Sequence, residues 1–156
     1  MEYEVIGMPA MMVIGIERPL MPGKQLRIDV HEHWDRFHKE KILEKIPNKI
    51  SNEILGLYCD YENGNQSPYQ FVIGCKVSSI MNIPKGMVAK IIPESRYAMF
   101  HAQGEFPKSV QDVWDAVWKK GLKRTFTGDF ELYGKKFNNP DKGVEVYVAI
   151  DEYNKL

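Results

Sequence analysis

The sequence predicts a mixed fold of helices and strands, built from two modules that each follow the order strand, helix, strand, strand. Short apolar stretches of strand length alternate with two amphipathic helical stretches, one in each half of the 156 residues. The halves also match by residue type, with Trp-Asp in each helix and Leu-Tyr in a following strand. We therefore expect one domain, residues 1–156, with an internal repeat over about 1–80 and 81–156.

The first half begins with an apolar stretch, Met11 to Glu17, whose flanking prolines indicate a strand with defined ends. From about Arg27 to Ile46, apolar residues recur at steps of three and four, which predicts an amphipathic helix that ends before Pro47. Two further strands, Glu53 to Tyr61 and Tyr69 to Val77, are separated by a turn rich in Asn, Gly, Ser and Pro.

The second half repeats this order. Met87 to His101 is strand material interrupted by a proline, and a helix runs from Pro107 to Gly121, since proline favours the first helical position and glycine the position after the last. The stretch from Thr127 to Phe137 is predicted to be a strand. A turn at Asn138 to Gly143 then leads into a closing strand, Val144 to Ile150.

Composition excludes several classes of protein. Hydrophobic residues make up 44% and charged residues 27%, and 21 basic residues balance 21 acidic ones, as in ordinary globular proteins. The short basic clusters are interleaved with acids, so no basic stripe for nucleic acid is present. The N-terminal stretch carries acids at positions 2 and 4 and resembles neither a secretory signal nor a membrane span. We expect a cytoplasmic protein without membrane contact.

The metal-ligating residue types do not form a recognisable site. Cys59 and Cys75 are not a CxxC pair, which favours two reduced, buried thiols over a zinc site or a disulfide. The four histidines include one HxH, but it lies in no HExxH helix or other metal-binding context. We expect no metal and no cofactor.

The strand around Glu131 carries the first candidate for chemistry. Alternation along a strand places Asp129, Glu131 and Tyr133 on one face, and a carboxylate on a half-covered face needs a partner, a cation or water. A solvated strand glutamate is the alternative. Matching the halves sets Gly56 at the position of Glu131 and Gly74 at that of Tyr147.

This match predicts that functional groups of the second half face small residues of the first. The cluster expected on one side of the sheet contains Glu131, Tyr133, Glu145 and Tyr147 from the second half, and Tyr58 from the first. The opposite, apolar faces should take the helices; they contain Leu55, Leu57, Cys59, Phe71, Ile73 and Cys75 in one half, and Phe130, Leu132, Val144, Val146 and Val148 in the other.

Several stretches occur in a distinctive order and spacing: IPESRYAMFHAQGEFPKSVQDVWDAVW, DFELYG and VEVYVAI in the second half, with GLYCDYE and YQFVIG in the first. Their order and spacing resemble the GyrI-like superfamily, the effector-binding domain of AraC-type and multidrug-responsive bacterial activators, in its stand-alone, integron-associated form. The resemblance implies an α+β fold with a mostly antiparallel sheet and a ligand cleft where the two modules meet.

The resemblance also implies a function, the binding of lipophilic, often cationic aromatic compounds such as drugs, dyes and xenobiotics. The central glutamate of the family carries over to Glu131, and acid and tyrosine positions on the last strand carry over to Glu145 and Tyr147. Candidates for ring stacking are Tyr97, Phe106, Trp114 and Trp118, although Trp114, like Trp34 and Phe37, is also explained as core by its helical spacing.

Three functional alternatives remain open. A binding or sequestering module is favoured over an enzyme, because an acid with tyrosines does not by itself specify a reaction. Some members of the superfamily hydrolyse cyclopropane-bearing alkylating compounds, for which Glu131 would be the general base and Tyr133 or Tyr147 the hydrogen-bond donor. Others act on DNA gyrase, so a gyrase or a regulator is a third candidate partner. No room is left outside residues 11–150 for the DNA-binding segment of family regulators, so we expect no direct binding of nucleic acid.

Overall fold

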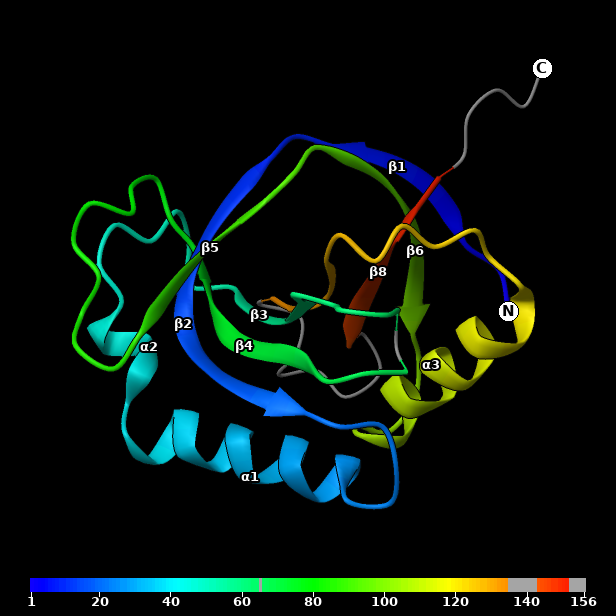
Figure 1. The fold of residues 1–156 in the computed structure, drawn as a ribbon, viewed down its shortest axis with the longest axis horizontal. Coiled ribbons are helices and arrows are strands. Elements are labelled where there is room, and N and C mark those ends of the chain that lie inside the picture. Colours follow the sequence, from blue (N-terminus) through cyan, green and yellow to red (C-terminus); the bar gives the residue numbers. More distant parts are fainter. Residues whose placement is uncertain (65, 135–142, 152–156) are drawn as a thin grey trace.

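Eight strands form one sheet in which every neighbouring pair is antiparallel, within residues 1–64, 66–134 and 143–151, the part of the chain that the computed structural model describes. Their order is β1-β6-β8-β7-β3-β4-β2-β5 (Figure 1). The strands are β1 (Glu4–Met8), β2 (Met11–Leu20), β3 (Ile54–Cys59), β4 (Tyr69–Lys76), β5 (Val88–Ile92), β6 (Ser95–Ala102), β7 (Asp129–Tyr133) and β8 (Val144–Ile150). The predicted α+β class with an antiparallel sheet is confirmed.

The helices are α1 (Leu26–Lys39), α2 (Ile42–Lys45) and α3 (Lys108–Lys120). The prediction of one helix from Arg27 to Ile46 is therefore wrong, because Lys41 takes a left-handed conformation with φ 53° and separates α1 from α2. At 3.6 residues per turn, a continuous helix would direct Ile42 about 140° away from Phe37. The break lets both side chains enter the same core.

Other boundaries also differ from the sequence prediction. β1 was not expected, whereas the interruption expected at the proline within Met87 to His101 is present, between β5 and β6. The strand expected from Thr127 is β7, which ends at Tyr133. Residues 135–142, which include most of the expected turn, lie outside the described residues.

The outer strands are exchanged between the two halves of the chain. β1 leads directly into β2, yet it pairs with β6 of the second half; β5 leads into β6, yet it pairs with β2 of the first. Each half therefore completes the edge of the other. The middle of the sheet is the β3–β7 pair, where the two halves also meet.

The hairpin registers of the two halves agree residue by residue. In the first half Leu55 pairs with Gly74 and Gly56 with Ile73. In the second half, the matched residues Phe130 and Glu131 pair with Tyr147 and Val146. The positions matched from sequence thus occupy equivalent places in space.

The predicted grouping of faces is wrong. Directly paired residues of antiparallel strands point to the same face, so Glu131 shares a face with Val146, whereas Tyr147 shares the opposite face with Phe130. Both faces of β7 and β8 are apolar enough to be buried. The alternation of side chains along β7 and along β8 therefore does not reveal which face of β7 lies on the same side of the sheet as which face of β8.

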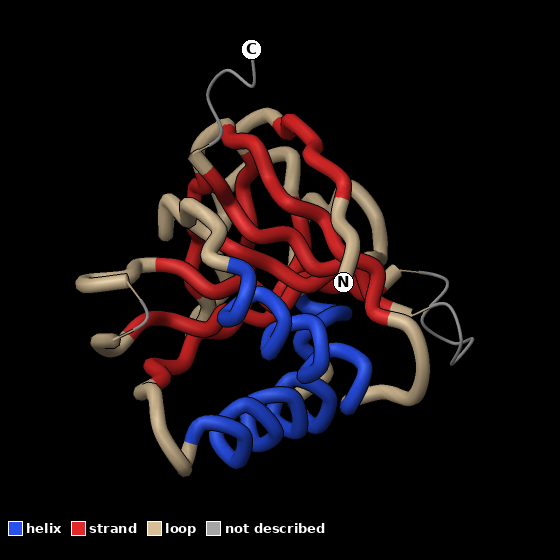
Figure 2. Tube along the Cα trace, turned by 90° about the vertical axis from the view of Figure 1, so that its right-hand side faces the viewer, coloured by secondary structure: helices blue, strands red, loops and turns tan. Residues whose placement is uncertain are grey.

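The sheet curls, so that its two ends fold over its own centre. Residues of β1 and β5, at opposite ends of the strand order, pack into one core with Leu55 and Leu57 of β3 and Phe130 of β7. The helices cover the other face (Figures 1 and 2). There, α1 packs on Phe71, Ile73 and Cys75 and α3 on Val144, Val146 and Val148, as predicted, whereas Leu55, Leu57, Cys59, Phe130 and Leu132 face away from them.

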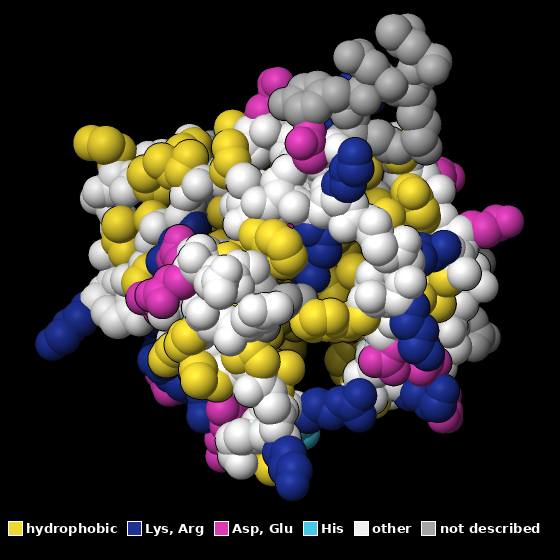
Figure 3. All heavy atoms as spheres, turned by 45° about the vertical axis from the view of Figure 1, so that its right-hand side comes forward, with side chains coloured by type: hydrophobic (Ala, Val, Ile, Leu, Met, Phe, Trp, Pro, Cys, Tyr) yellow, Lys and Arg dark blue, Asp and Glu magenta, His cyan; other side chains and the backbone are white. Residues whose placement is uncertain are grey.

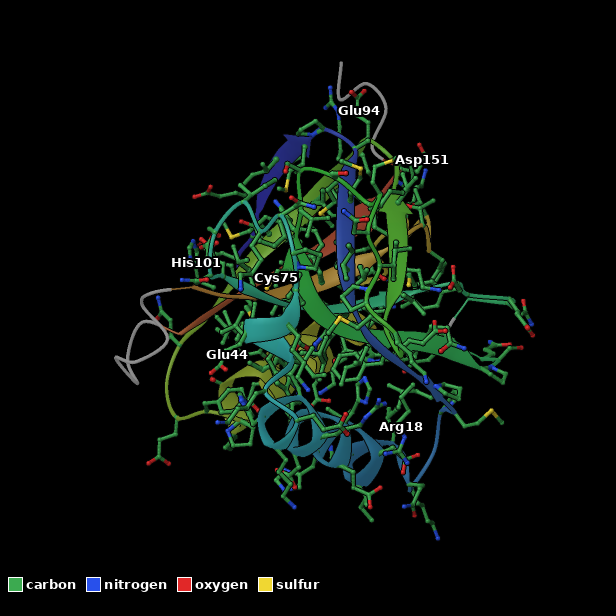
Figure 4. The ribbon with its side chains drawn as sticks, turned by 90° about the vertical axis from the view of Figure 1, so that its left-hand side faces the viewer. Arg18, Glu44, Cys75, Glu94, His101 and Asp151 are labelled. Carbon is green, nitrogen blue, oxygen red and sulfur yellow. The ribbon has the colours of Figure 1, made fainter. Side chains whose placement is uncertain are left out.

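Polar contacts of Arg18 and His33 fix α1 on the sheet. Arg18, near the end of β2 and labelled in Figure 4, forms ion pairs with Asp29 at 3.0 Å and with Glu32 at 3.2 Å. His33 Nε2 lies 2.9 Å from the carbonyl oxygen of Ile16, and burial lowers the pKa of His33. A neutral imidazole that donates to this carbonyl explains why a histidine is tolerated in the core.

β2 and β4 approach so closely that glycine is required at their contact. A Cβ added to Gly74 would lie 2.1 Å from the carbonyl oxygen of Ile14.

We expect Gly74→Ala to lower the free energy of unfolding by about 1–3 kcal/mol, because backbone must move to relieve the overlap. Urea unfolding measures the change. Gly7→Ala, whose Cβ would meet nothing within 4 Å, is the control, and an equal effect of both substitutions would contradict this explanation.

Candidate functional site

A pocket of about 1510 Å³ lies between α1 and α3 on the helical side of the sheet. Its floor is formed by β3 and β7, where the two halves of the chain meet, and it is lined by residues of both helices. The face drawn in Figure 3 is hollowed, with hydrophobic side chains around the hollow. The cleft expected between the modules is therefore present.

Glu131 lies on this floor and is almost fully buried, with 3% of its surface exposed. Its Oε2 accepts hydrogen bonds from the Tyr58 hydroxyl at 2.9 Å and the Trp114 Nε1–H at 2.8 Å. Its Oε1 accepts one from the Tyr133 hydroxyl at 2.6 Å. Within the described residues Glu131 forms no ion pair. A buried carboxylate is thus held by neutral donors from both halves.

Burial raises the pKa of the Glu131 carboxyl, because the charged form loses water. The hydrogen bonds from Tyr133, Trp114 and Tyr58 oppose this shift only in part. Burial and the nearby carboxylate raise the pKa values of Tyr58 and Tyr133 well above the ordinary range, so both hydroxyls remain protonated donors.

The pocket walls repeat one aromatic arrangement twice. The rings of Trp34 and Tyr133 lie 4.9 Å apart at 74°, and those of Trp114 and Tyr58 lie 5.5 Å apart at 78°. Each pair joins a helix of one half to a strand of the other. The edge-to-face geometry is favourable for aromatic rings and fixes the tyrosine hydroxyls toward Glu131.

Gly56 makes room for the carboxylate. It pairs directly with Glu131 across β3 and β7, and a Cβ there would lie 3.2 Å from Glu131 Oε1 and 3.5 Å from the Trp34 ring. The glycine of one half therefore accommodates the acid of the other, as the matched sequences predict.

A second buried carboxylate beside the pocket was not predicted as a site. Asp129, fully buried, accepts from Arg124 Nη2 at 2.8 Å, from the Tyr61 hydroxyl at 2.7 Å and from the backbone N–H of Ala149 at 2.8 Å. The Arg124 guanidinium also lies over the Phe126 ring at 4.3 Å. Because Asp129 has a cationic partner, its charge is compensated, unlike that of Glu131.

The structure brings six of the nine predicted site residues into the lining on the helical side: Glu131, Tyr58, Tyr133, Phe106, Trp114 and Trp118. The other three are placed differently. Glu145 lies at the edge of the pocket on the strand face opposite to Glu131, and its Oε1 accepts from the Tyr147 hydroxyl at 3.0 Å. Tyr147 and Tyr97 belong to the core under the curled sheet.

The prediction that Glu145 and Tyr147 cluster with Glu131 is therefore wrong. This also separates Tyr147 from the general base of the hydrolase alternative, and leaves Tyr133 as its donor. Trp34 was missed as a pocket residue, although its match with Trp114 was the signal that could have identified it. Phe37, also expected in the core, is there.

Metal-ligating side chains do not gather in groups of three or more anywhere in the described part of the chain. None of the helices within the described ranges is both long and apolar enough to cross a membrane.

A family model described as Cass2, integron-associated effector binding protein, matches residues 4–150. The chain belongs to this family. The resemblance to GyrI-like effector-binding domains that the sequence predicts is thereby confirmed. Among relatives of this Cass2-family chain, YobU of Bacillus subtilis is 32% identical over 123 residues, which cover 75% of this chain and 76% of YobU.

Two further proteins extend the comparison. The transcriptional regulator BrlR of Pseudomonas aeruginosa is 26% identical over 160 aligned residues, which cover 96% of this chain but only 56% of BrlR. The structure of SAV2435 bound to tetraphenylphosphonium superimposes with a TM-score of 0.81 at 21% identity, covering 97% of this chain and 94% of SAV2435. This likeness shows that the two proteins share a fold.

The raised pKa of Glu131 predicts how pH affects stability. A folded-state pKa above the unfolded one contributes stability that is complete below the unfolded pKa and is lost as pH rises through the folded pKa. Glu131→Gln keeps an acceptor for the Trp114 N–H and removes the titration. We therefore expect the variant to gain stability relative to the parent as pH rises above about 4.5, the unfolded value.

Urea unfolding of both proteins between pH 4 and pH 8 measures this difference. Glu145→Gln, which makes the same chemical change at the pocket edge on the opposite strand face, is the control for the substitution itself. A difference between Glu131→Gln and the parent that stays constant with pH would contradict a raised pKa.

Proposed function

We propose that this Cass2-family protein binds lipophilic cations with delocalised charge, and that Glu131 supplies the countercharge. One observation carries the proposal: the carboxylate on the pocket floor is 3% exposed, accepts three neutral hydrogen bonds and has no cationic partner within the described residues. Uncompensated charge in such a place is costly, and a cationic ligand removes the cost.

The walls favour a particular kind of cation. A delocalised cation is weakly hydrated, so it loses little on leaving water, and each aromatic face that it meets contributes about 0.5–2 kcal/mol. Trp34, Trp114, Tyr58 and Tyr133 surround the carboxylate, and Trp118 lies farther out, 61% exposed. A compact, strongly hydrated ammonium would gain less here than an aryl-substituted ion.

The size of the pocket supports a broad range of ligands. Its volume of about 1510 Å³ exceeds the roughly 300–1,000 Å³ of ordinary ligand pockets. Aromatic contacts also impose few directional demands on a ligand. The shared fold with SAV2435, described as bound to tetraphenylphosphonium, makes that ion a suitable first probe.

Removing the countercharge tests the proposal. We expect Glu131→Gln to weaken binding of tetraphenylphosphonium at least tenfold, about 1.4 kcal/mol, measured by isothermal titration calorimetry. Glu145→Gln makes the same chemical change at the half-buried edge of the pocket, on the strand face opposite to Glu131, and should stay within about threefold of the parent. Equal affinity of the parent and Glu131→Gln would show that Glu131 is not the countercharge.

A neutral ligand separates charge from shape. Triphenylphosphine oxide carries similar aromatic rings without a net charge, so the Glu131→Gln substitution should change its affinity little. A loss equal to that for tetraphenylphosphonium would mean that the substitution damages the pocket itself.

Binding should also depend on pH. A bound cation favours the ionised carboxylate, so it lowers the raised pKa of Glu131, and protonation of the free protein competes with binding. We expect the affinity for tetraphenylphosphonium to fall as pH is lowered through the pKa of the free protein. The limiting slope is about tenfold per pH unit, by linkage to one proton. Glu131→Gln should lack this dependence, and a slope retained in that variant would assign it to another group.

A further inference from the structure

The inner half of the pocket has approximate twofold symmetry. This symmetry affects which shapes of ligand the pocket can accept. Gly56 and Glu131 occupy matched positions and pair with each other, and on either side of them Leu55 pairs with Leu132 and Leu57 with Phe130. Since Leu55 matches Phe130 and Leu57 matches Leu132, a twofold rotation exchanges these pairs. A pseudo-twofold axis therefore passes through the floor of the pocket beside Glu131.

The walls obey the same axis. Seven residues of α1 line the pocket, and seven in and just before α3 do so at positions 80 residues later in the chain. Three of these matched pairs are identical in type: Val30 and Val110, Trp34 and Trp114, Asp35 and Asp115. With the similar Trp–Tyr contacts described above, each side of the axis offers a ligand a similar inner wall.

The symmetry fails at two levels, which have different effects. At the axis, Glu131 faces Gly56, so one acid is present where strict symmetry would require two adjacent carboxylates, which cannot both ionise easily. The single carboxylate at the axis accepts hydrogen bonds from both walls, from Tyr58 and Trp114 on one side and from Tyr133 on the other. Away from the axis the other four matched helix pairs differ, so a ligand that extends beyond the inner residues meets unequal surroundings: Trp118 matches His38, Phe106 matches Leu26, Pro107 matches Arg27 and Gln111 matches His31.

We propose that the inner pocket is a twofold-symmetric site for cations that carry two equivalent aromatic arms, one against each wall. A short cation with one aromatic arm binds in two orientations related by the axis. This inference rests on the proposed function and specifies the ligand class that fits it: the positive centre lies beside Glu131 and the arms extend toward α1 and α3.

Blocking one wall at a time tests the inference. Val30→Phe and Val110→Phe place a ring in the space for one arm on matched sides, and a third variant carries both substitutions. Tetraphenylphosphonium is the probe with equivalent arms, and benzyltrimethylammonium is the one-armed probe, short enough to stay inside the rim. Dissociation constants from NMR titration are compared among the three variants and the parent.

For benzyltrimethylammonium we expect each single variant to raise the dissociation constant only about twofold, since one of two equal orientations is lost, and the double variant to raise it at least tenfold. For tetraphenylphosphonium, which uses both walls at once, each single variant should weaken binding, and the two losses should agree within about threefold. A loss confined to one of the two single variants would overturn the inference.

A second measurement covers the case in which an enlarged side chain disturbs folding. In the parent protein, the phenyl protons of bound benzyltrimethylammonium should show nuclear Overhauser effects to the indole protons of both Trp34 and Trp114, assigned with Trp34→Phe. Nuclear Overhauser effects to only one of the two indoles would overturn the inference. The proposed function would still stand in that case if Glu131→Gln weakens the binding of tetraphenylphosphonium. If Glu131→Gln leaves the affinity for tetraphenylphosphonium unchanged, the proposed function is overturned, and this inference with it.

Discussion

The site depends on one constraint: the carboxylate of Glu131 is buried without a cation within the described residues, and hydroxyl and indole groups from both halves of the chain must hold it. Neutral donors satisfy its hydrogen-bonding capacity but leave its charge uncompensated, which is why its pKa stays raised. The contrast with Asp129 is informative, because that equally buried carboxylate has an arginine beside it. Asp129 thus has a structural role, whereas Glu131, two residues later, is the candidate ligand-binding acid.

The sheet topology places the donors around this carboxylate. Because β3 and β7 pair at the centre of the sheet, the tyrosine of each half reaches the same acid, and each tryptophan packs on the tyrosine of the other half. The exchange of β1 and β5 makes neither half complete alone. We interpret the halves as copies of one module that diverged at the axis, where glycine in one copy leaves space for glutamate in the other.

In the proposed function, the site selects by charge and shape rather than by directional hydrogen bonds. Both carboxylate oxygens already accept hydrogen bonds from protein groups, so a ligand interacts with the charge through space and with the rings through their faces. An effector-binding family benefits from this property, because compounds with unrelated polar groups can share one pocket. The breadth and the symmetry of the pocket have a common origin in the repeated walls.

The sequence alone determined the repeated order of the main elements, the matched positions of the halves and Glu131 as the central candidate, because these depend on local periodicity and residue type. It did not determine which faces of neighbouring strands coincide: β7 and β8 are apolar on both sides, so Tyr147 and Glu145 were assigned to the face of Glu131 when they lie on the other. Nor could it reveal the exchanged edge strands or the burial of the ion pair between Arg124 and Asp129. Those features arise from contacts between residues distant in sequence, whose geometry only the folded sheet defines.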